Sequence, residues 1–164
     1  MNAQNGTPPG GRGARFARPT VRRTYCVFNK KEQSFLGLSI GRCDTTVTRL
    51  RGLLGKVGLK SGEGLWFVPS QGVHTVGVLF PVDVVFLDAQ NKVIHLIEHL
   101  RPLRISGLKL KCMSVLQLPT HTIYSSQTHV GDDLLICEPH EMDAYLKTSP
   151  LKGTPSELPK RVSA

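Results

Sequence analysis

The sequence lacks the local patterns that identify common classes of enzyme. It contains no Gly-x-Ser-x-Gly motif, no P-loop and no dinucleotide-binding glycine motif with its acidic partner. The cysteines form no Cys-x-x-Cys pair, which excludes a zinc knuckle and a thioredoxin-type redox site, and we expect buried thiols instead. Since no catalytic constellation is complete, we favour a protein without catalytic residues, cofactor or metal.

Long apolar runs are also absent. A membrane span needs about 20 largely apolar residues, and the longest promising uncharged stretch, residues 64–82, is interrupted by prolines, glycines and polar side chains. The first residues hold no apolar run of the kind that a secretory signal requires. We therefore expect a cytoplasmic protein without disulfides, although an Arg-rich, acid-poor start is also compatible with a transit peptide.

Acidic residues are scarce beside basic ones. The 164 residues include 21 Lys and Arg against 12 Asp and Glu, a formal charge of +9. Residues 1–23 contain no acid and five arginines, which contribute +5 of that excess: Arg12, Arg15, Arg18, Arg22 and Arg23. Their Gly- and Pro-rich composition predicts a disordered arm. Such an arm favours association with nucleic acid or another acidic surface, but aromatic side chains that would stack on bases are nearly absent from it.

The length fits one globular domain with two tails. Residues 24–137 consist mainly of short apolar runs between turn residues, a pattern typical of a β-rich domain. Strands are expected at 24–28, 35–40, 65–68, 82–87, 92–100, 113–118 and 134–137, and a short helix near 45–55. Residues 138–164 are expected to add a short helix and then a disordered tail.

One motif points to a metal. His95-Leu96-Ile97-Glu98-His99 matches the H-x-x-E-H pattern of some zinc peptidases. The chemistry requires a helix, because only there do imidazoles at i and i+4 share one face. Turn residues on both sides and a strong strand before the motif favour a strand, in which the two imidazoles would lie about 13 Å apart. A metal-dependent hydrolase using His95, Glu98 and His99 is therefore the least favoured alternative.

Asp83 interrupts the apolar run of residues 82–87. A buried carboxylate costs free energy unless it is hydrogen-bonded or paired. In one interpretation Asp83 is structural, accepting backbone N–H bonds from a neighbouring loop or pairing with an arginine such as Arg51. In another it is a ligand or acid–base group near His74, which lies in Val73-His74-Thr75. In a third interpretation, Asp83 is simply exposed to solvent at the edge of a sheet.

The order of several motifs resembles the domain of unknown function 192 family. The motifs are RLRGLLGK at 49–56, GLWFVP at 64–69, VHT at 73–75, FPVDVVFLD at 80–88 and Gly131-Asp132, and the similarity spans roughly residues 35–137. The resemblance implies a β-dominated α+β fold: a compact, bent antiparallel, partly barrel-like sheet with one short helix near residues 45–55. It also favours a strand for residues 92–100. The family has no assigned reaction.

The sequence therefore predicts a small non-catalytic binding or accessory module for a partner protein or small ligand. Its expected surface lies around His74, Thr75, Asp83, Arg49 and Arg51. The alternative is nucleic-acid or acidic-surface association through the arginines of residues 1–23.

Overall fold

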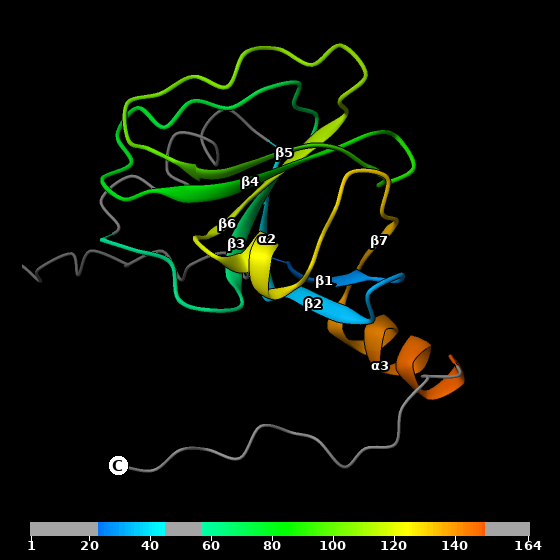
Figure 1. Cartoon of the computed structure of the whole chain (residues 1–164). Helices are drawn as coiled ribbons and strands as arrows, with labels where there is room; N and C mark the ends of the chain where they lie inside the picture. Colours follow the sequence, from blue (N-terminus) through cyan, green and yellow to red (C-terminus); the bar gives the residue numbers. More distant parts are fainter. Residues whose placement is uncertain (1–22, 45–56, 150–164) are drawn as a thin grey trace, which may run out of the picture.

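The structure is a computed structural model and describes residues 23–44 and 57–149. One strongly curved sheet of seven strands dominates it (Figure 1). The strands are β1 (Thr24–Asn29), β2 (Ser34–Cys43), β3 (Glu63–Phe67), β4 (Val82–Leu87), β5 (Val93–Leu100), β6 (Ser114–Pro119) and β7 (Leu134–Cys137). The helices are α2 (Thr122–Ser125) and α3 (Pro139–Thr148). The expected β-dominated fold with a bent, partly barrel-like sheet is confirmed.

The strands follow the order β5-β4-β6-β3-β2-β1-β7 in the sheet. Neighbouring strands are antiparallel except β2 and β3, which run parallel. A parallel pair cannot be joined by a tight hairpin and needs a crossover connection. That connection includes residues 45–56, so the expected helix near 45–55 lies outside the described residues.

The hairpin of β4 and β5 shows how local sequence sets the fold. Every residue of β4 is buried, as expected for an apolar run of β-branched residues with cover on both faces. In the turn, the Asp88 carboxylate accepts the backbone N–H groups of Gln90 and Lys92, each at 2.9 Å. Asn91 takes the left-handed conformation with φ 60°. Asp and Asn favour such turns because their side chains bond to nearby backbone.

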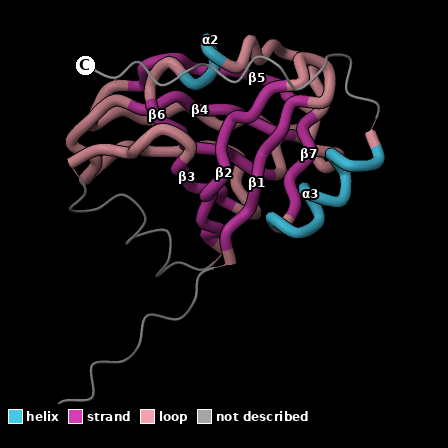
Figure 2. The backbone as a smooth tube through the Cα atoms, turned by 90° about the horizontal axis from the view of Figure 1, so that it is seen from below, coloured by secondary structure: helices cyan, strands magenta, loops and turns pink. Residues whose placement is uncertain are grey.

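Two apolar cores lie on opposite faces of the sheet. Val85 and Leu87 of β4 belong to the core that includes Ile123 of α2. Val84 and Phe86 point the other way, into a core with Val73 from the loop before β4. Successive side chains of a strand alternate between faces, so Asp83 lies on the α2 side. A smaller cluster joins α3 to β1, and Figure 2 shows α3 beside the β1 and β7 end of the sheet.

The two ends of the sheet are tied together. The loop before β7 bonds to the first residue of the other edge strand, β5: Gly131 N–H donates to the Val93 carbonyl at 2.7 Å, and Val93 N–H donates to the Asp132 carbonyl at 2.9 Å. The sheet therefore curls far enough for its ends to meet through a loop. Among the described helices, none has the length and apolar character needed to cross a membrane.

Candidate functional site

Asp83 is fully buried and bonds to backbone. Its Oδ1 accepts the N–H of His99 at 3.1 Å, and its Oδ2 accepts the N–H of Ile123 at 3.0 Å. Glu98 and His99 together oppose Asp83 where the β4–β5 register shifts, which is a bulge. Ile123 is in the first turn of α2, whose N–H groups have no partner within the helix. The carboxylate thus holds a bulge and a helix start, which matches the structural interpretation.

Two histidines lie beside that carboxylate. The rings of His99 and His121 meet edge to face with centroids 4.6 Å apart, and His99 Nδ1 is 4.0 Å from Asp83 Oδ1. Both have left-handed backbone, with φ 53° and 69°. A carboxylate behind an imidazole can fix the ring's orientation. Within the described chain, however, no third ligand joins these two rings in a metal-binding group.

The H-x-x-E-H motif lies on a strand. His95 and His99 are both in β5, so the helix that zinc-peptidase chemistry requires is absent at the motif. The His95 ring packs against Phe86 with centroids 5.3 Å apart, and burial, with a smaller contribution from Lys109, lowers the pKa of His95. Glu98 is exposed. The expected strand is confirmed, and the motif has no geometry that supports a metal-dependent hydrolase.

A group of possible metal ligands occurs elsewhere, where sequence analysis did not find it. Ligand atoms of Glu32, His129 and Asp132 lie within 4.8 Å of one another. The Lys31 ammonium already bridges the two carboxylates, 3.0 Å from Glu32 and 3.2 Å from Asp132. Burial acts to raise the pKa of Asp132, but hydrogen bonds from His129, Asn29 and Lys31 bring it below its ordinary value. One of the two negative charges in the group is therefore already balanced by a side chain of the protein itself.

His74 and Thr75 lie in a loop that pairs with another loop far along the chain. We call residues 69–80 and 101–113 the paired loops. Backbone bonds join them in antiparallel fashion: Thr75 N–H donates to Arg104 at 2.8 Å, and Ser106 N–H to Val73 at 2.9 Å. The buried Thr75 hydroxyl donates to the Arg101 carbonyl at 2.7 Å and accepts the Arg104 N–H at 2.9 Å. The paired loops cross the top of the molecule in Figure 1, far from α3.

Among the described residues, those predicted for the site are placed on two faces of the sheet. Val73 and Val78 pack on the sheet face opposite to Asp83, and the His74 side chain is exposed. The structure therefore brings Thr75 and His74 together with residues 101–105, and it does not bring them to Asp83. Arg49 and Arg51 lie outside the described residues, as do Arg12, Arg15, Arg18 and Arg22. Arg23 is described and exposed.

The outer side of the paired loops is apolar and basic. Five large apolar side chains are between 73% and 86% exposed: Leu79, Leu103, Ile105, Leu108 and Leu110. Arg101, Arg104 and Lys111 are exposed beside them, and Lys109 is half-buried. Neither loop contains an acidic residue. Sequence analysis missed this surface, although the alternating Leu and Lys of residues 108–111 were a visible signal.

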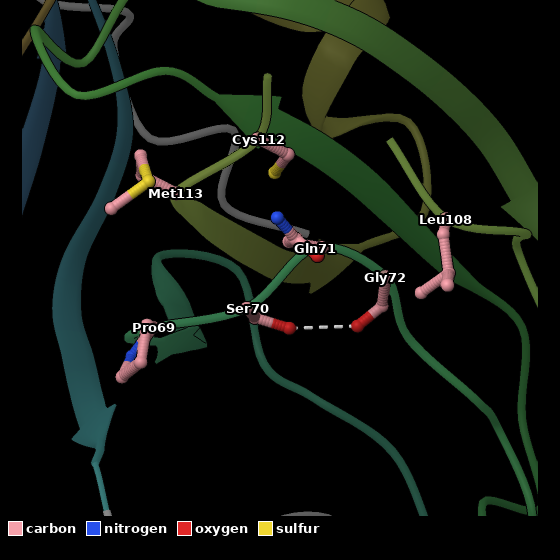
Figure 3. A pocket seen from close by; sticks show the side chains of 7 residues that line it. All are labelled: Pro69, Ser70, Gln71, Gly72, Leu108, Cys112 and Met113. Atoms are coloured by element: carbon pink, nitrogen blue, oxygen red, sulfur yellow. Dashed lines mark hydrogen bonds between the residues drawn. The ribbon is translucent and has the colours of Figure 1, made fainter. Parts of the chain in front are cut away.

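A shallow hollow of about 450 Å³ lies where the two loops begin and end (Figure 3). It is lined by Pro69, Ser70, Gln71, Gly72, Leu108, Cys112 and Met113. The Ser70 hydroxyl donates to the Gly72 carbonyl at 2.7 Å. The Cys112 thiol is buried and donates to the Ser114 carbonyl at 3.1 Å, and burial raises its pKa. A protonated, hydrogen-bonded thiol is a poor nucleophile, so the hollow has no catalytic group of that kind.

Two solved structures are similar to this chain. A "putative transcription regulator" from Sinorhizobium meliloti aligns with TM-score 0.60 and 15% identity, covering 71% of this chain and 94% of its own. A protein of unknown function from Novosphingobium aromaticivorans aligns with TM-score 0.58 and 16% identity, covering 80% of this chain and 99% of its own. At these identities the likeness concerns the fold alone. No curated protein is a detectable sequence relative.

The sequence also matches a family model. The family is DUF192, described as "Uncharacterized ACR", and the match extends over residues 27–136, more than half of the chain. It includes the second half of β1, all of β2 to β6 and α2, and most of β7, and thus both Asp83 and the paired loops. The resemblance found in the motifs is confirmed: this chain belongs to the DUF192 family.

Proposed function

We propose that this protein is a non-catalytic binding module that docks through the paired loops. The observation that carries the proposal is the surface of five highly exposed apolar side chains interleaved with basic ones. An exposed apolar patch rimmed by polar residues marks an interaction site on a folded protein. His74 and Thr75 belong both to the surface predicted from the sequence and to the one proposed here. The centre of the proposed surface is residues 101–113.

The paired loops are built to present that surface. Their inner residues are fixed, because Val73 and Val78 pack in a sheet core and the Thr75 hydroxyl bonds to the opposite loop. Binding to a surface held in one conformation costs less entropy than binding to a loop that must first become ordered. The exposed side chains are therefore carried by a backbone whose conformation is already fixed before binding.

A second candidate rests on charge. The five arginines of residues 1–23 support nucleic-acid or acidic-surface association through phosphate or carboxylate contacts.

We also propose that the protein acts in the cytoplasm, which is supported by the absence of disulfides among its four cysteines.

Site-specific photo-crosslinking tests the docking surface without assuming the partner. A photoreactive benzoylphenylalanine replaces Leu108 in the full chain, and the matched control carries it at Val130, an exposed apolar position outside the paired loops. Irradiation in cells is expected to give a discrete adduct with the Leu108 probe and none with the Val130 probe. Equal labelling at both positions, or the absence of any adduct with protein or lipid at Leu108, would overturn the proposed function.

A further inference from the structure

We infer that the paired loops dock on the surface of an anionic lipid bilayer. This inference rests on the proposed function and names the class of its partner. It is carried by three properties of the surface: how the apolar side chains project, which charges lie between them, and what holds the loops from below.

The apolar side chains project outward, and of the five only Leu108 also lines the hollow of Figure 3. With exposed fractions from 73% to 86%, Leu103, Ile105, Leu108 and Leu110 are too open to be packed against one another. A protein partner would need a separate pocket for each of them to reach the packing density of an interface core. The acyl region of a bilayer accepts projecting apolar side chains of any arrangement, and binding strengthens with the apolar area that enters it.

The charges between those side chains have one sign. Arg101, Arg104, Lys109 and Lys111 alternate with the apolar residues, and the paired loops contain no carboxylate. Anionic headgroups attract such basic clusters at a membrane surface. Long basic side chains can also lie along an apolar surface while their charged ends stay in water. Interfaces between proteins, in contrast, are depleted in lysine, although they are enriched in arginine. The single sign of the charges and the presence of two lysines therefore favour headgroups over a protein surface.

The support beneath the loops completes the argument. The exposed side chains lie on the outer side, whereas Val73 and Val78 pack into a core on the β4 sheet face. Backbone bonds such as Leu103 N–H to the Thr75 carbonyl at 3.2 Å and Lys109 N–H to the Gln71 carbonyl at 2.8 Å keep the two loops together. The outer side chains can consequently enter a headgroup layer without exposing the core or breaking a backbone bond.

Sedimentation of the full chain with lipid vesicles tests this inference. One set of vesicles is phosphatidylcholine alone, and the other contains added phosphatidylserine. The wild-type protein is expected to sediment with the anionic vesicles and far less with the neutral ones. Removing two inserted leucines in Leu108→Ser with Leu110→Ser is expected to lower the partition coefficient at least about tenfold, because both side chains lose the transfer of their apolar surface from water into the bilayer.

Two controls isolate the paired loops. The variant Leu38→Ser with Val130→Ser removes two exposed apolar side chains elsewhere and is expected to bind as the wild type does. The variant Arg12→Gln, Arg15→Gln and Arg18→Gln measures the contribution of the N-terminal arginines, and the effect of the two leucines is expected to persist in that background. Unchanged thermal melting confirms that each variant is folded.

The outcomes separate the inference from the proposed function. Equal binding to neutral and anionic vesicles, no binding to either, or wild-type binding by the double serine variant would overturn the lipid inference. If a protein adduct forms at Leu108 while the vesicles are not bound, docking through the paired loops stands and its partner is a protein. If neither an adduct nor vesicle binding is found, both proposals fail.

Discussion

Asp83 shows why a charged residue can occupy the centre of an apolar strand. The bulge of β5 and the first turn of α2 each leave a backbone N–H that neither a strand nor a helix partner reaches, and the carboxylate accepts both. Leaving two buried donors without acceptors would cost about 1–3 kcal/mol for each of them. The burial of one carboxylate is offset by satisfying two N–H groups that the bent fold creates.

The first prediction concerns this residue. Asp83→Asn keeps the shape but places an NH₂ group against one of the two N–H donors, so we expect the free energy of unfolding to fall by about 1–3 kcal/mol. Urea denaturation measures the loss. Asp88→Asn is the comparison, because Asp88 accepts two N–H groups on one oxygen in a partly exposed turn, so that the amide oxygen of Asn can still accept both and a smaller loss is expected. A similar loss in both variants would contradict the importance of burial at Asp83.

At the scale of elements, the paired loops depend on a close backbone contact. A Cβ atom added at Gly72 would lie 3.0 Å from the Gly107 carbonyl oxygen, which is closer than side chains normally approach backbone. The carbonyl belongs to the opposite loop, and Lys109 N–H bonds to Gln71 next to it. Glycine at position 72 therefore lets the two loops come within hydrogen-bonding distance.

The second prediction follows from that contact. Gly72→Val is expected to separate the paired loops and to speed amide hydrogen exchange at Thr75 and Ser106, while exchange in β4 changes little. Hydrogen exchange read by mass spectrometry or NMR checks this. Gly58→Val serves as the control, since nothing lies within 4 Å of a Cβ built there. Unchanged protection at Ser106 in Gly72→Val would show that the loops tolerate the added side chain.

The strands could be predicted because their signals are local. Residues 82–87 and 134–137 are strands with the expected bounds, and the short helix expected within residues 138–164 is α3. Apolar runs, prolines and turn residues set those limits within a few positions of each element. The helix α2 was not predicted, since it has four residues and is held by Asp83, which is 40 positions away from Ile123.

The candidate site was harder to predict for the same reason. Burial cost correctly indicated that Asp83 needs hydrogen-bond partners, but the sequence did not reveal that they are backbone groups of His99 and Ile123. The pairing of residues 73–75 with 103–106 depends on backbone bonds across about thirty residues, which leave no periodic pattern. Leu and Lys alternate in residues 108–111, but only the pairing of the two loops determines which of these side chains face solvent.

For the molecule as a whole, the curved sheet is closed by one loop. The Asp132 backbone carbonyl accepts the Val93 N–H of β5, and its side chain accepts the Asn29 amide of β1 at 2.9 Å. One residue thereby connects the edge strand β5 to β1, the strand that neighbours the other edge strand, β7. The Lys31 ammonium and the His129 N–H complete the set of donors around the same carboxylate.

This connection makes the stability of the closed sheet dependent on pH. The pKa of Asp132 is lower in the folded protein than its ordinary value, because the hydrogen bonds from His129, Asn29 and Lys31 outweigh the opposing effect of burial. The unfolded state therefore takes up a proton first as pH falls. The stabilisation is complete above the ordinary Asp pKa of about 3.9 and is lost as pH falls through the lower folded value.

The third prediction is that Asp132→Asn reduces stability most at neutral pH and progressively less in acid. Urea unfolding of both proteins between neutral and acidic pH measures the difference, which is expected to be constant above the ordinary Asp pKa and to shrink below it. Asp133→Asn, at the exposed neighbouring residue, is expected to leave the pH dependence unchanged. A difference that does not vary with pH would mean that the Asp132 side chain acts through shape alone. A decreasing difference would instead show that ionised Asp132 helps hold the two ends of the sheet together.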